Sequence, residues 1–420
     1  MTKNRSQAPK IEALQGISLL QPERYCAPGG LPIYVSRHVP NDIFHIQIEF
    51  GAGKIQQSKP LQSSFTSELL FSGTNNFTQL EIQEMLDIQG AFVSMESAIS
   101  STILNIYGLT DKLEAILKIV DEVLQNAEFP QTVFDLHRRA AQQKHQINMD
   151  KNSYVARREF LQALMPNHPI GKVADNLDFE NITREDCAQF YQQHLKQNIK
   201  QILVVGALSG VHLQLLQDTF SERYYATQNS FDAPQTTPPK DCYLEKPQAL
   251  QSTIRIGKIL FTPKHPDYFE FDIVETILGG YFGSRLMQNL REDKGYTYGI
   301  GSGLTTYDNA AYFFISTEVS KEHKFAAMEA IRFEIERLQT ELISLEELEL
   351  ARAYIQGQVL KSTDGAFAQM NQFLFAQRFD LDPNYLDEFL ATLNNISPER
   401  IRDLAQQYLD WDSMTKVIVG

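Results

Sequence analysis

The chain has 420 residues and a formal net charge of −14, from 38 Lys and Arg against 52 Asp and Glu. Hydrophobic residues make up 43% of it and aromatic residues 10%, which is typical of packed globular domains and too apolar for disorder. This length predicts two or three domains. The acidic balance argues against nucleic acid and anionic membranes as partners, because both repel a negatively charged surface.

The cysteines and the hydropathy pattern point to an intracellular protein without a membrane anchor. The three cysteines are scattered and form no Cys-x-x-Cys pair, so we expect three reduced thiols rather than a disulfide framework or a thiolate zinc site. The N-terminal residues lack the apolar stretch of a secretory signal. The longest apolar runs, such as residues 202–208, are far shorter than the ~18–20 residues that cross a bilayer. The sequence therefore predicts a soluble, cytoplasmic protein.

The first half of the chain alternates strands and helices. Residues 44–50 alternate between apolar and polar side chains, which is the period of a half-buried strand. The other elements predicted for this half are helices at 61–71 and 79–88, a strand pair at 91–96 and 101–107, helices at 111–127, 132–148, 155–165 and 184–195, and a buried strand at 199–205.

The second half repeats nearly the same order. Its predicted elements are a strand at 252–261, helices at 268–278 and 284–292, a strand pair at 297–303 and 311–317, helices at 325–341, 345–360, 367–378 and 398–408, and a strand at 415–419. Corresponding elements lie about 205–215 positions apart throughout, which indicates an internal duplication.

Between the halves, residues 227–246 are polar, rich in proline and without periodicity, as in a solvated linker. We therefore predict a first domain at 1–226, a linker at 227–246 and a second domain at 247–420. Each domain is expected to be an α+β layer, a mostly antiparallel sheet with helices covering one face. Two such halves enclose a cleft.

No complete catalytic constellation is visible. None of the nine histidines forms the i, i+4 pair that directs two imidazoles at one zinc ion, and there is no Gly-x-Ser-x-Gly elbow or Walker A loop. The glycine cluster at 279–283 follows no predicted strand, so a turn between two helices is favoured over a phosphate-binding loop.

Residues 61–74 carry a resemblance to a known family. They are similar to the zinc-site helix of the M16 (insulinase, or pitrilysin-like) metallopeptidases, which reads His-x-x-Glu-His followed by an apolar pair, Phe, a variable residue, Gly and Thr. The tail of this motif is intact from Leu70 to Thr74. Its metal-binding part is not, because Ser64 replaces the first His, Ser67 the catalytic Glu and Glu68 the second His.

The family's third zinc ligand, a Glu some 75–77 residues further on, is also missing. That window holds Gln143, Lys144 and His145. The family's zinc chemistry needs two neutral imidazoles, a carboxylate ligand and a second carboxylate as base. Serine is neither a good zinc ligand nor a base near pH 7. Glu68 and His145 supply two ligands at most, so a solvated helix face is favoured over a rearranged metal site.

A second resemblance lies in residues 279–298. These residues are similar to the C-terminal-domain signature of the short bacterial M16 proteins, in which an Arg and a Tyr seven positions later hold the substrate across the cleft from zinc. Arg291 and Tyr298 match these positions, with a Lys-Gly turn between them. The match in length, duplication and both motif regions extends over most of the chain.

The same two residues have a physical reading of their own. Arg291 falls near a predicted helix end, Tyr298 on the next strand, and Gly295 at the reversal between them. A guanidinium and a phenol hydroxyl both donate hydrogen bonds to a peptide carbonyl or to the oxyanion that it becomes. The structural alternative is an Arg stabilised at a helix C-terminus and a Tyr that fills a sheet surface.

The strand at 44–50 resembles the strand that borders the family's cleft, where an extended substrate adds as a further strand. An interior strand of the N-terminal sheet is an equally good interpretation. His45, on its polar face, is expected to be a surface residue rather than a ligand.

The resemblance implies a clamshell of two protomers, each with two homologous α+β domains, as in LuxS/M16-type proteins. In some bacterial pairs one subunit keeps the zinc motif and the other keeps the Arg/Tyr pair. The chain has the second pattern, which implies a subunit without its own metal or cofactor, a homologous zinc-bearing partner, and peptides or unfolded proteins as substrates. Alone, it is expected to be inactive. Whether it then forms a homodimer is left open.

Two alternatives remain open from the sequence. One is a non-catalytic scaffold or assembly subunit, which would not need the Arg/Tyr pair. The other is a self-sufficient enzyme in which a homodimer binds zinc through unusual ligands, against which Ser64 and Ser67 argue.

Overall fold

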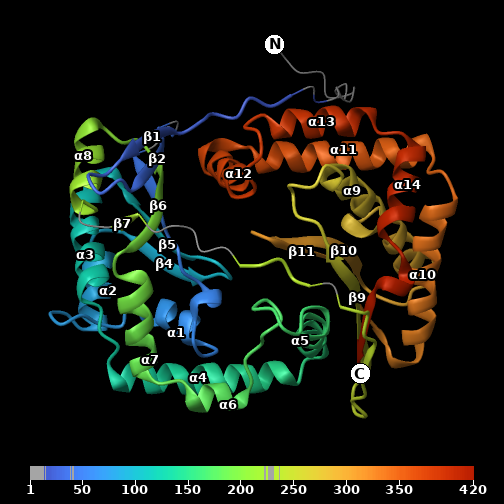
Figure 1. Ribbon diagram of the computed structural model, residues 1–420, viewed down its shortest axis with the longest axis horizontal. Coiled ribbons are helices and arrows are strands. Elements are labelled where there is room, and N and C mark those ends of the chain that lie inside the picture. Colours follow the sequence, from blue (N-terminus) through green and yellow to red (C-terminus); the bar gives the residue numbers. More distant parts are fainter. Residues whose placement is uncertain are drawn as a thin grey trace, which may run out of the picture.

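The structure is a computed structural model that describes residues 14, 16–37, 39, 42–221, 224–225, 231–235 and 237–420. It has two halves, each built on one sheet (Figure 1). The first half contains β1 (Glu23–Cys26), β2 (Pro32–Ser36), β3 (Ile43–Phe50), η1 (Lys54–Gln56), α1 (Gln62–Leu69), α2 (Gln79–Ile88), β4 (Phe92–Ser97), β5 (Thr102–Leu109), η2 (Thr110–Lys112), α3 (Leu113–Asn126), α4 (Gln131–Met149), α5 (Asn152–Leu164), α6 (Asn176–Asn181), α7 (Arg184–Phe190), η3 (Tyr191–Leu195), β6 (Asn198–Gly206), α8 (Gly210–Thr219) and β7 (Tyr224–Tyr225).

The second half begins at β8. It contains β8 (Cys242–Leu244), β9 (Gln251–Leu260), α9 (Tyr268–Glu275), η4 (Thr276–Gly280), η5 (Met287–Asp293), β10 (Ile300–Tyr307), β11 (Ala310–Ser320), η6 (Lys321–His323), α10 (Lys324–Thr340), α11 (Leu345–Ser362), α12 (Gly365–Phe379), α13 (Tyr385–Asn395), α14 (Pro398–Tyr408), η7 (Trp411–Ser413) and β12 (Thr415–Val419). The expected α+β class is confirmed, because each half combines a sheet with covering helices.

The first sheet is mixed, with the strand order β1-β2-β6-β3-β5-β4 and β7 beside β6. Only the β2–β6 and β6–β7 pairs are parallel. In β3 every second side chain is buried, as the alternation predicted. The strand lies in the interior of the sheet, since it pairs with β5 on one side and β6 on the other. The expectation that β3 is a free edge for an added strand is therefore wrong, and the interior alternative holds.

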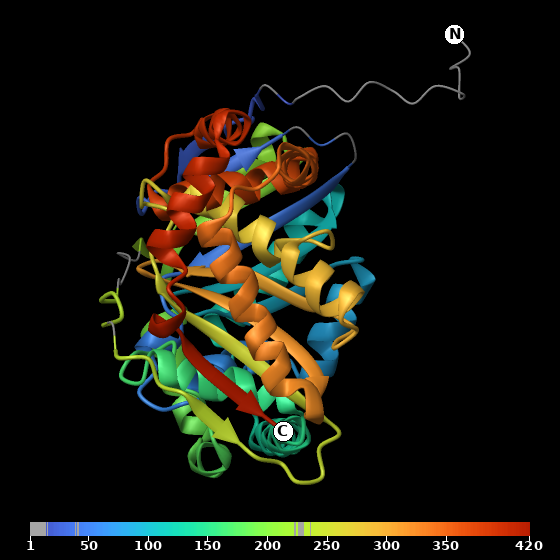
Figure 2. The same ribbon diagram turned by 90° about the vertical axis from the view of Figure 1, so that its right-hand side faces the viewer.

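The second sheet has the order β10-β11-β9-β12-β8, and only β12–β8 is parallel. The helices α10 and α14 lie on its outer face (Figure 2). Its strand β8 falls within the segment predicted as a linker, so the end of that segment belongs to the sheet. Residues 227–230 and 236 of the predicted linker lie outside the described part of the chain.

One helix from each half packs on the sheet of the other half. Helix α5 of the first half forms one apolar cluster with β12 and β11 of the second half, in which Phe160 meets Tyr312. Strand β9 accepts this helix at Gly257, where a Cβ would stand 2.9 Å from the Phe160 ring. In return, Met370 of α12 packs on β6 of the first sheet, beside Leu203. The two halves therefore share their inner layers.

The start of the described chain ties the halves together a second time. Residues 16–20 run along α11, α12 and α13 before the chain enters β1 (Figure 1). The Ile17 amide donates to Asp387 Oδ1 at 2.7 Å, and the Leu20 amide donates to Gln369 Oε1 at 3.0 Å. Within the described residues, no helix is long and apolar enough to cross a membrane.

The exchanged helices predict that the two halves unfold together. We expect Phe160→Ala to lower the free energy of unfolding by about 3–5 kcal/mol, because this buried ring leaves a cavity at the surface between the halves. Urea unfolding followed by the fluorescence of Trp411, the chain's one tryptophan, measures the effect from the opposite half. Leu136→Ala, on the exposed face of α4, is the control. An unchanged Trp411 transition in the Phe160 variant would contradict this coupling.

Candidate functional site

Helix α1 uses its serines for its own backbone. The Ser67 hydroxyl is almost fully buried and donates to the Ser63 carbonyl at 2.8 Å. The Ser64 hydroxyl donates to the Leu61 carbonyl at 3.0 Å. Both hydroxyl protons are thus donated within one turn of the same helix, and a neutral serine hydroxyl is a poor zinc ligand and no base near pH 7.

Glu68 faces a different histidine from the one expected. Its Oε2 lies 3.1 Å from His137 Nε2 on α4, although the two atoms are not aligned as a hydrogen bond. His145, two turns further along α4, instead pairs its Nδ1 with the Tyr154 hydroxyl at 3.1 Å. Burial and the nearby Arg158 lower the pKa of His145. Glu68 and His145 therefore do not form a metal pair with each other, and the sequence analysis missed His137.

The surroundings of α1 are also unfavourable for a cation. A cavity of about 370 Å³ beside Ser64 is lined by Lys54, Lys59 and Lys172. Burial and the nearby Arg157 lower the pKa of Lys54. Among the described residues, no group of three His, Cys, Asp or Glu side chains could hold a metal ion. The residues present at α1 do not fit zinc.

In the second half, Arg291 and Tyr298 both face outward. Arg291 lies on the π-helix η5, with its guanidinium 4.4 Å from the centre of the Phe282 ring and 3.6 Å from Glu292. The Tyr298 side chain is 92% exposed. Gly295, between them, has φ = +63° and makes the predicted reversal, because L side chains disfavour that conformation.

The sequence predicted Tyr298 on a strand, but the structure places it outside one. It stands in the turn before β10, which begins at Ile300. The turn is held by Thr297, whose hydroxyl donates to the Glu318 carbonyl at 2.7 Å. The side-chain hydrogen bond of Thr297 thus connects this turn to β11 in place of main-chain strand pairing. The Tyr298 ring stays exposed. The glycine cluster at 279–283 ends η4 and enters a turn, as predicted.

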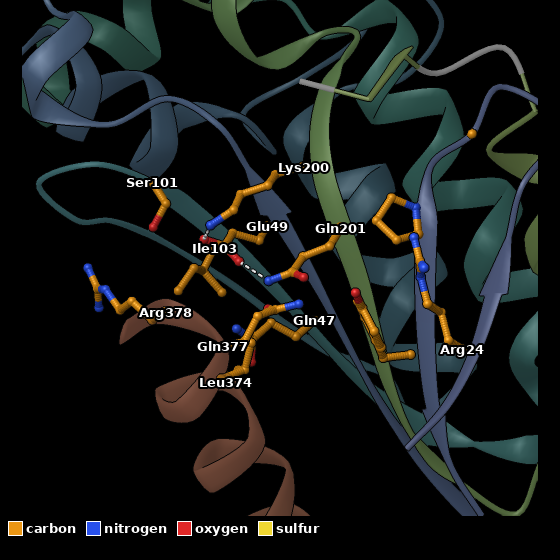
Figure 3. Close-up of a pocket in the computed structure, with 13 residues that line it drawn as sticks. Arg24, Gln47, Glu49, Ser101, Ile103, Lys200, Gln201, Leu374, Gln377 and Arg378 are labelled. Carbon is orange, nitrogen blue, oxygen red and sulfur yellow. Dashed lines mark hydrogen bonds and ion pairs between the residues drawn. The ribbon is translucent and has the colours of Figure 1, made fainter. Parts of the chain in front are cut away.

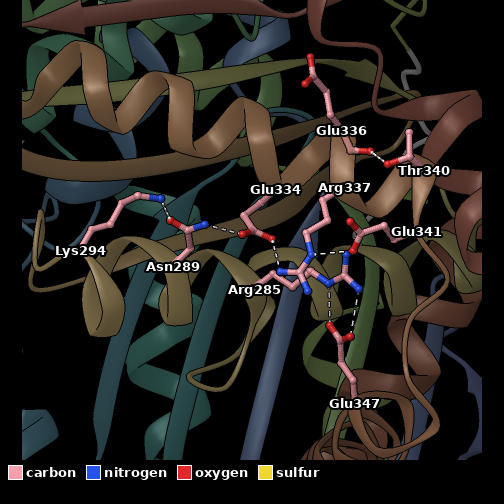
Figure 4. A network of polar contacts seen from close by, with 9 residues as sticks. All are labelled: Arg285, Asn289, Lys294, Glu334, Glu336, Arg337, Thr340, Glu341 and Glu347. Carbon is pink, nitrogen blue, oxygen red and sulfur yellow. Dashed lines mark hydrogen bonds and ion pairs between the residues drawn. The ribbon is translucent and has the colours of Figure 1, made fainter.

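A network of buried charges holds the segment that carries Arg291 (Figure 4). Arg285, just before η5, makes a two-pronged ion pair with Glu347 of α11, at 2.7 and 3.0 Å. Asn289 of η5 donates to Glu334 of α10, which is 1% exposed. Arg337 Nη1 lies 3.4 Å from the other oxygen of Glu334. These contacts anchor η5 to two helices and keep Arg291 on its outer side.

An edge strand of the first sheet is β4, whereas β3 is interior; β1 ends the sheet on the other side. Strand β4 contacts α1, where the Ser97 and Ser63 hydroxyls share a hydrogen bond. Phe92 at its start is 63% exposed. On the interior strand β3, His45 bonds to Asn105 at 2.9 Å and stacks on Tyr107, and burial lowers its pKa.

A polar cavity between the halves was not foreseen from the sequence. It has a volume of about 390 Å³ and lies between the first sheet and α12 (Figure 3). On the sheet side, Glu49 accepts from Lys200 at 2.9 Å and from Gln201 at 2.6 Å. Arg378 of α12 lines the opposite side and pairs with Asp308. Only the packing of α12 on the first sheet brings these residues together.

Comparisons with known proteins agree with this architecture. Residues 181–355 match the family model described as "Peptidase M16 inactive domain". A crystal structure of a peptidase M16 inactive domain from Pseudomonas fluorescens superposes with a TM-score of 0.86 at 21% identity, covering 96% of this chain and 98% of the other. A protease from Helicobacter pylori superposes with a TM-score of 0.82 at 16% identity, covering 95% and 99%.

Two curated proteins of Bacillus subtilis are similar in sequence. One, named uncharacterized zinc protease YmxG, is 20% identical over 93% of this chain and 96% of its own length. The other, named probable inactive metalloprotease YmfF, is 22% identical over 70% of each chain. The chain thus has the fold of M16 peptidase proteins, and its residues 181–355 match the inactive-domain type of that family.

The buried network predicts a strong dependence on Glu334. We expect Glu334→Ala to lower the free energy of unfolding by about 3 kcal/mol, because it leaves the buried Asn289 amide without its acceptor and leaves Arg337 with Glu341 alone. Glu336→Ala, two residues along α10 on its exposed side, should have little effect. Chemical unfolding measures both, and amide exchange should quicken in η5 of the first variant. Equal effects of the two substitutions would argue against the anchoring role.

Proposed function

We propose that the chain is the non-zinc subunit of a heterodimeric M16 metalloendopeptidase, and that it binds peptide substrate through Arg291 and Tyr298. The observation that carries the proposal is that Tyr298 is exposed, seven positions after an Arg291 whose guanidinium stacks on Phe282. A tyrosine that served only as sheet filler would be covered. Both side chains present donors to solvent on a rigidly anchored segment.

The proposed chemistry divides between two subunits. Arg291 and Tyr298 donate hydrogen bonds to the carbonyl next to the scissile bond, and they stabilise negative charge as it develops there. A homologous zinc-bearing subunit supplies the metal, whose bound water attacks the peptide. The engaged serines and the lysines around α1 support this division, because they leave this chain without a zinc site of its own.

The substrates proposed are peptides and unfolded protein segments. An extended peptide can add to an exposed strand edge through main-chain hydrogen bonds. In the first sheet β4 offers such an edge beside α1, with the exposed Phe92 at its start. The subunit is proposed to act in the cytoplasm, and to form a homodimer through the same surface when its partner is absent.

A second candidate function is a non-catalytic scaffold subunit. It is favoured by the similarity to a relative named as a probable inactive metalloprotease and to an inactive-domain family. The scaffold proposal requires a stable complex with the partner but no contribution of Arg291 or Tyr298 to catalysis, which separates the two functions.

Peptidase activity on a quenched, unstructured peptide tests the shared site. We expect activity only when this chain is mixed with the purified zinc-bearing homologue. Arg291→Ala and Tyr298→Phe should each lower kcat/KM of the mixture by roughly 10²-fold, the typical loss of one oxyanion donor. Arg332→Ala, an exposed arginine on α10, is the matched control.

The other outcomes decide against the proposal. Full activity of both variants in a complex that size-exclusion chromatography shows to be intact would favour the scaffold. Zinc-dependent activity of this chain alone would indicate a self-sufficient enzyme and direct attention to Glu68 and His137.

A further inference from the structure

An aromatic cavity lies in the second half, away from Arg291 and Tyr298. It has a volume of about 560 Å³, within the range of small-molecule sites. It opens between α9, η4, α11, α12 and α13, and its walls carry the aromatic side chains Tyr268, Phe269, Tyr354, Phe375, Tyr385 and Phe389. The Phe269 ring stacks on Tyr385, and Phe375 packs against the same tyrosine, so three of these rings form a continuous surface.

One carboxylate in the wall of this cavity has no partner. Asp272 lines the cavity, and part of its side chain is open to it. Among the described residues, nothing hydrogen-bonds to this carboxylate or pairs with it, and the cavity lining contains no Lys, Arg or His. Burial alone raises the pKa of Asp272 to about 6. An unpaired carboxylate in such a place is costly, so it calls for a proton or a cation.

A second carboxylate lies one turn further along. Glu275 is 6% exposed, and burial raises its pKa to about 7. Its Oε1 accepts from the Ser302 hydroxyl at 2.6 Å. Its Oε2 faces Gly280, where a Cβ would stand only 2.8 Å away. Gly280 also lines the cavity, so the glycine keeps the space beside this carboxylate clear.

We propose that this cavity binds an organic cation, an ammonium or guanidinium group that pairs with Asp272 and is carried on an apolar stem against the aromatic rings. Aromatic faces attract such cations, and their apolar edges accept the stem. A bare metal ion fits less well, because the described residues offer no cluster of three metal-ligating side chains here. The site is separate from the proposed peptidase function and needs no partner subunit.

Calorimetric titration of this chain alone tests the proposal with choline and benzylamine as probes. Their neutral counterparts, 3,3-dimethylbutan-1-ol and benzyl alcohol, have similar shapes without the charge. We expect saturable binding of the cations and at least tenfold weaker binding of the alcohols. Asp272→Asn should weaken cation binding at least tenfold, whereas Glu388→Gln, on the solvent side of α13, should leave it unchanged.

The pH dependence of binding gives a second readout. The titratable groups around Asp272 are Tyr268 and Glu275 on its own helix segment, Tyr354 on α11 and Tyr385 on α13, while α12 contributes only Asn371, Gln372 and Phe375 to the lining. Burial raises the pKa of both acids, so protons compete with the ligand at low pH. Cation affinity should therefore rise between pH 5 and pH 8.

Thermal melting shows whether the Asp272→Asn variant folds. The raised pKa means that the folded protein holds the Asp272 proton more tightly than the unfolded chain, so stability is lost as pH rises through about 6. Asp272→Asn, neutral at every pH, should therefore melt at a higher temperature than the wild type at pH 8. The two should melt alike only well below the ordinary aspartate pKa of 3.8, where Asp272 is protonated in both states.

Further arms identify the source of the cation. Binding of choline or benzylamine indicates a free amine. Stronger binding of Nα-acetyl-lysine amide, which mimics a lysine in a protein and keeps its ε-ammonium charge, indicates a protein side chain. Either result supports the site. Equal binding of cations and alcohols, or cation binding that survives Asp272→Asn, would overturn the proposal. So would the absence of saturable binding by any of the cationic probes.

Discussion

The exchange of α5 and α12 between the halves is the constraint on which the rest of the structure depends. The inner face of each sheet carries an apolar patch that the helices of its own half leave open, and a helix of the other half covers it. Phe160 against Tyr312 on one side, and Met370 against Leu203 on the other, complete the inner layers. Neither sheet is fully covered without the other half, so the duplication yields one interlocked unit.

The two motif regions, α1 in the first half and the segment from Arg285 to Tyr298 in the second, differ in what their polar side chains contact. In the first half, α1 carries serines whose hydroxyls bond to the helix backbone. In the second half, the segment from Arg285 to Tyr298 is held by a hydrogen bond to α10 and an ion pair to α11, and Tyr298 at its end is exposed. A catalytic contribution from this chain is therefore expected from its second half.

In the second half, some buried polar residues have partners and stabilise the fold, whereas others are left open to an external group. Arg285, Asn289 and Glu334 are buried and each is paired, although Nη1 of Arg285 has no hydrogen-bond partner among the described residues. Asp272, by contrast, is largely enclosed and has no partner, and Tyr298 is a large ring with no cover. An unpaired buried carboxylate and an uncovered aromatic ring each lower the stability of the fold. A bound ligand or partner that pairs with the one or covers the other recovers this free energy.

The sequence by itself determined the duplication, the α+β class and most helices and strands, because these follow from local periodicity and capping. The alternation of β3, the capping box of Thr78 and Glu81 at α2, and the reversal at Gly295 are all local. It also identified Arg291 and Tyr298 as candidates, although their role stays a prediction. The three-residue strand β8, too short to show a period, was missed, and so was α13 despite the helical spacing of its buried residues.

Only the tertiary structure decided which surfaces meet. It showed that β4 rather than β3 lies at an edge of the first sheet, that Glu68 faces His137 rather than His145, and that α5 covers the sheet of the other half. It also brought Asp272 into an aromatic cavity built from helices more than 70 positions apart along the chain. The physical reason is that periodicity tells which face of an element is apolar, whereas the partner that covers this face is set by packing between segments distant in sequence.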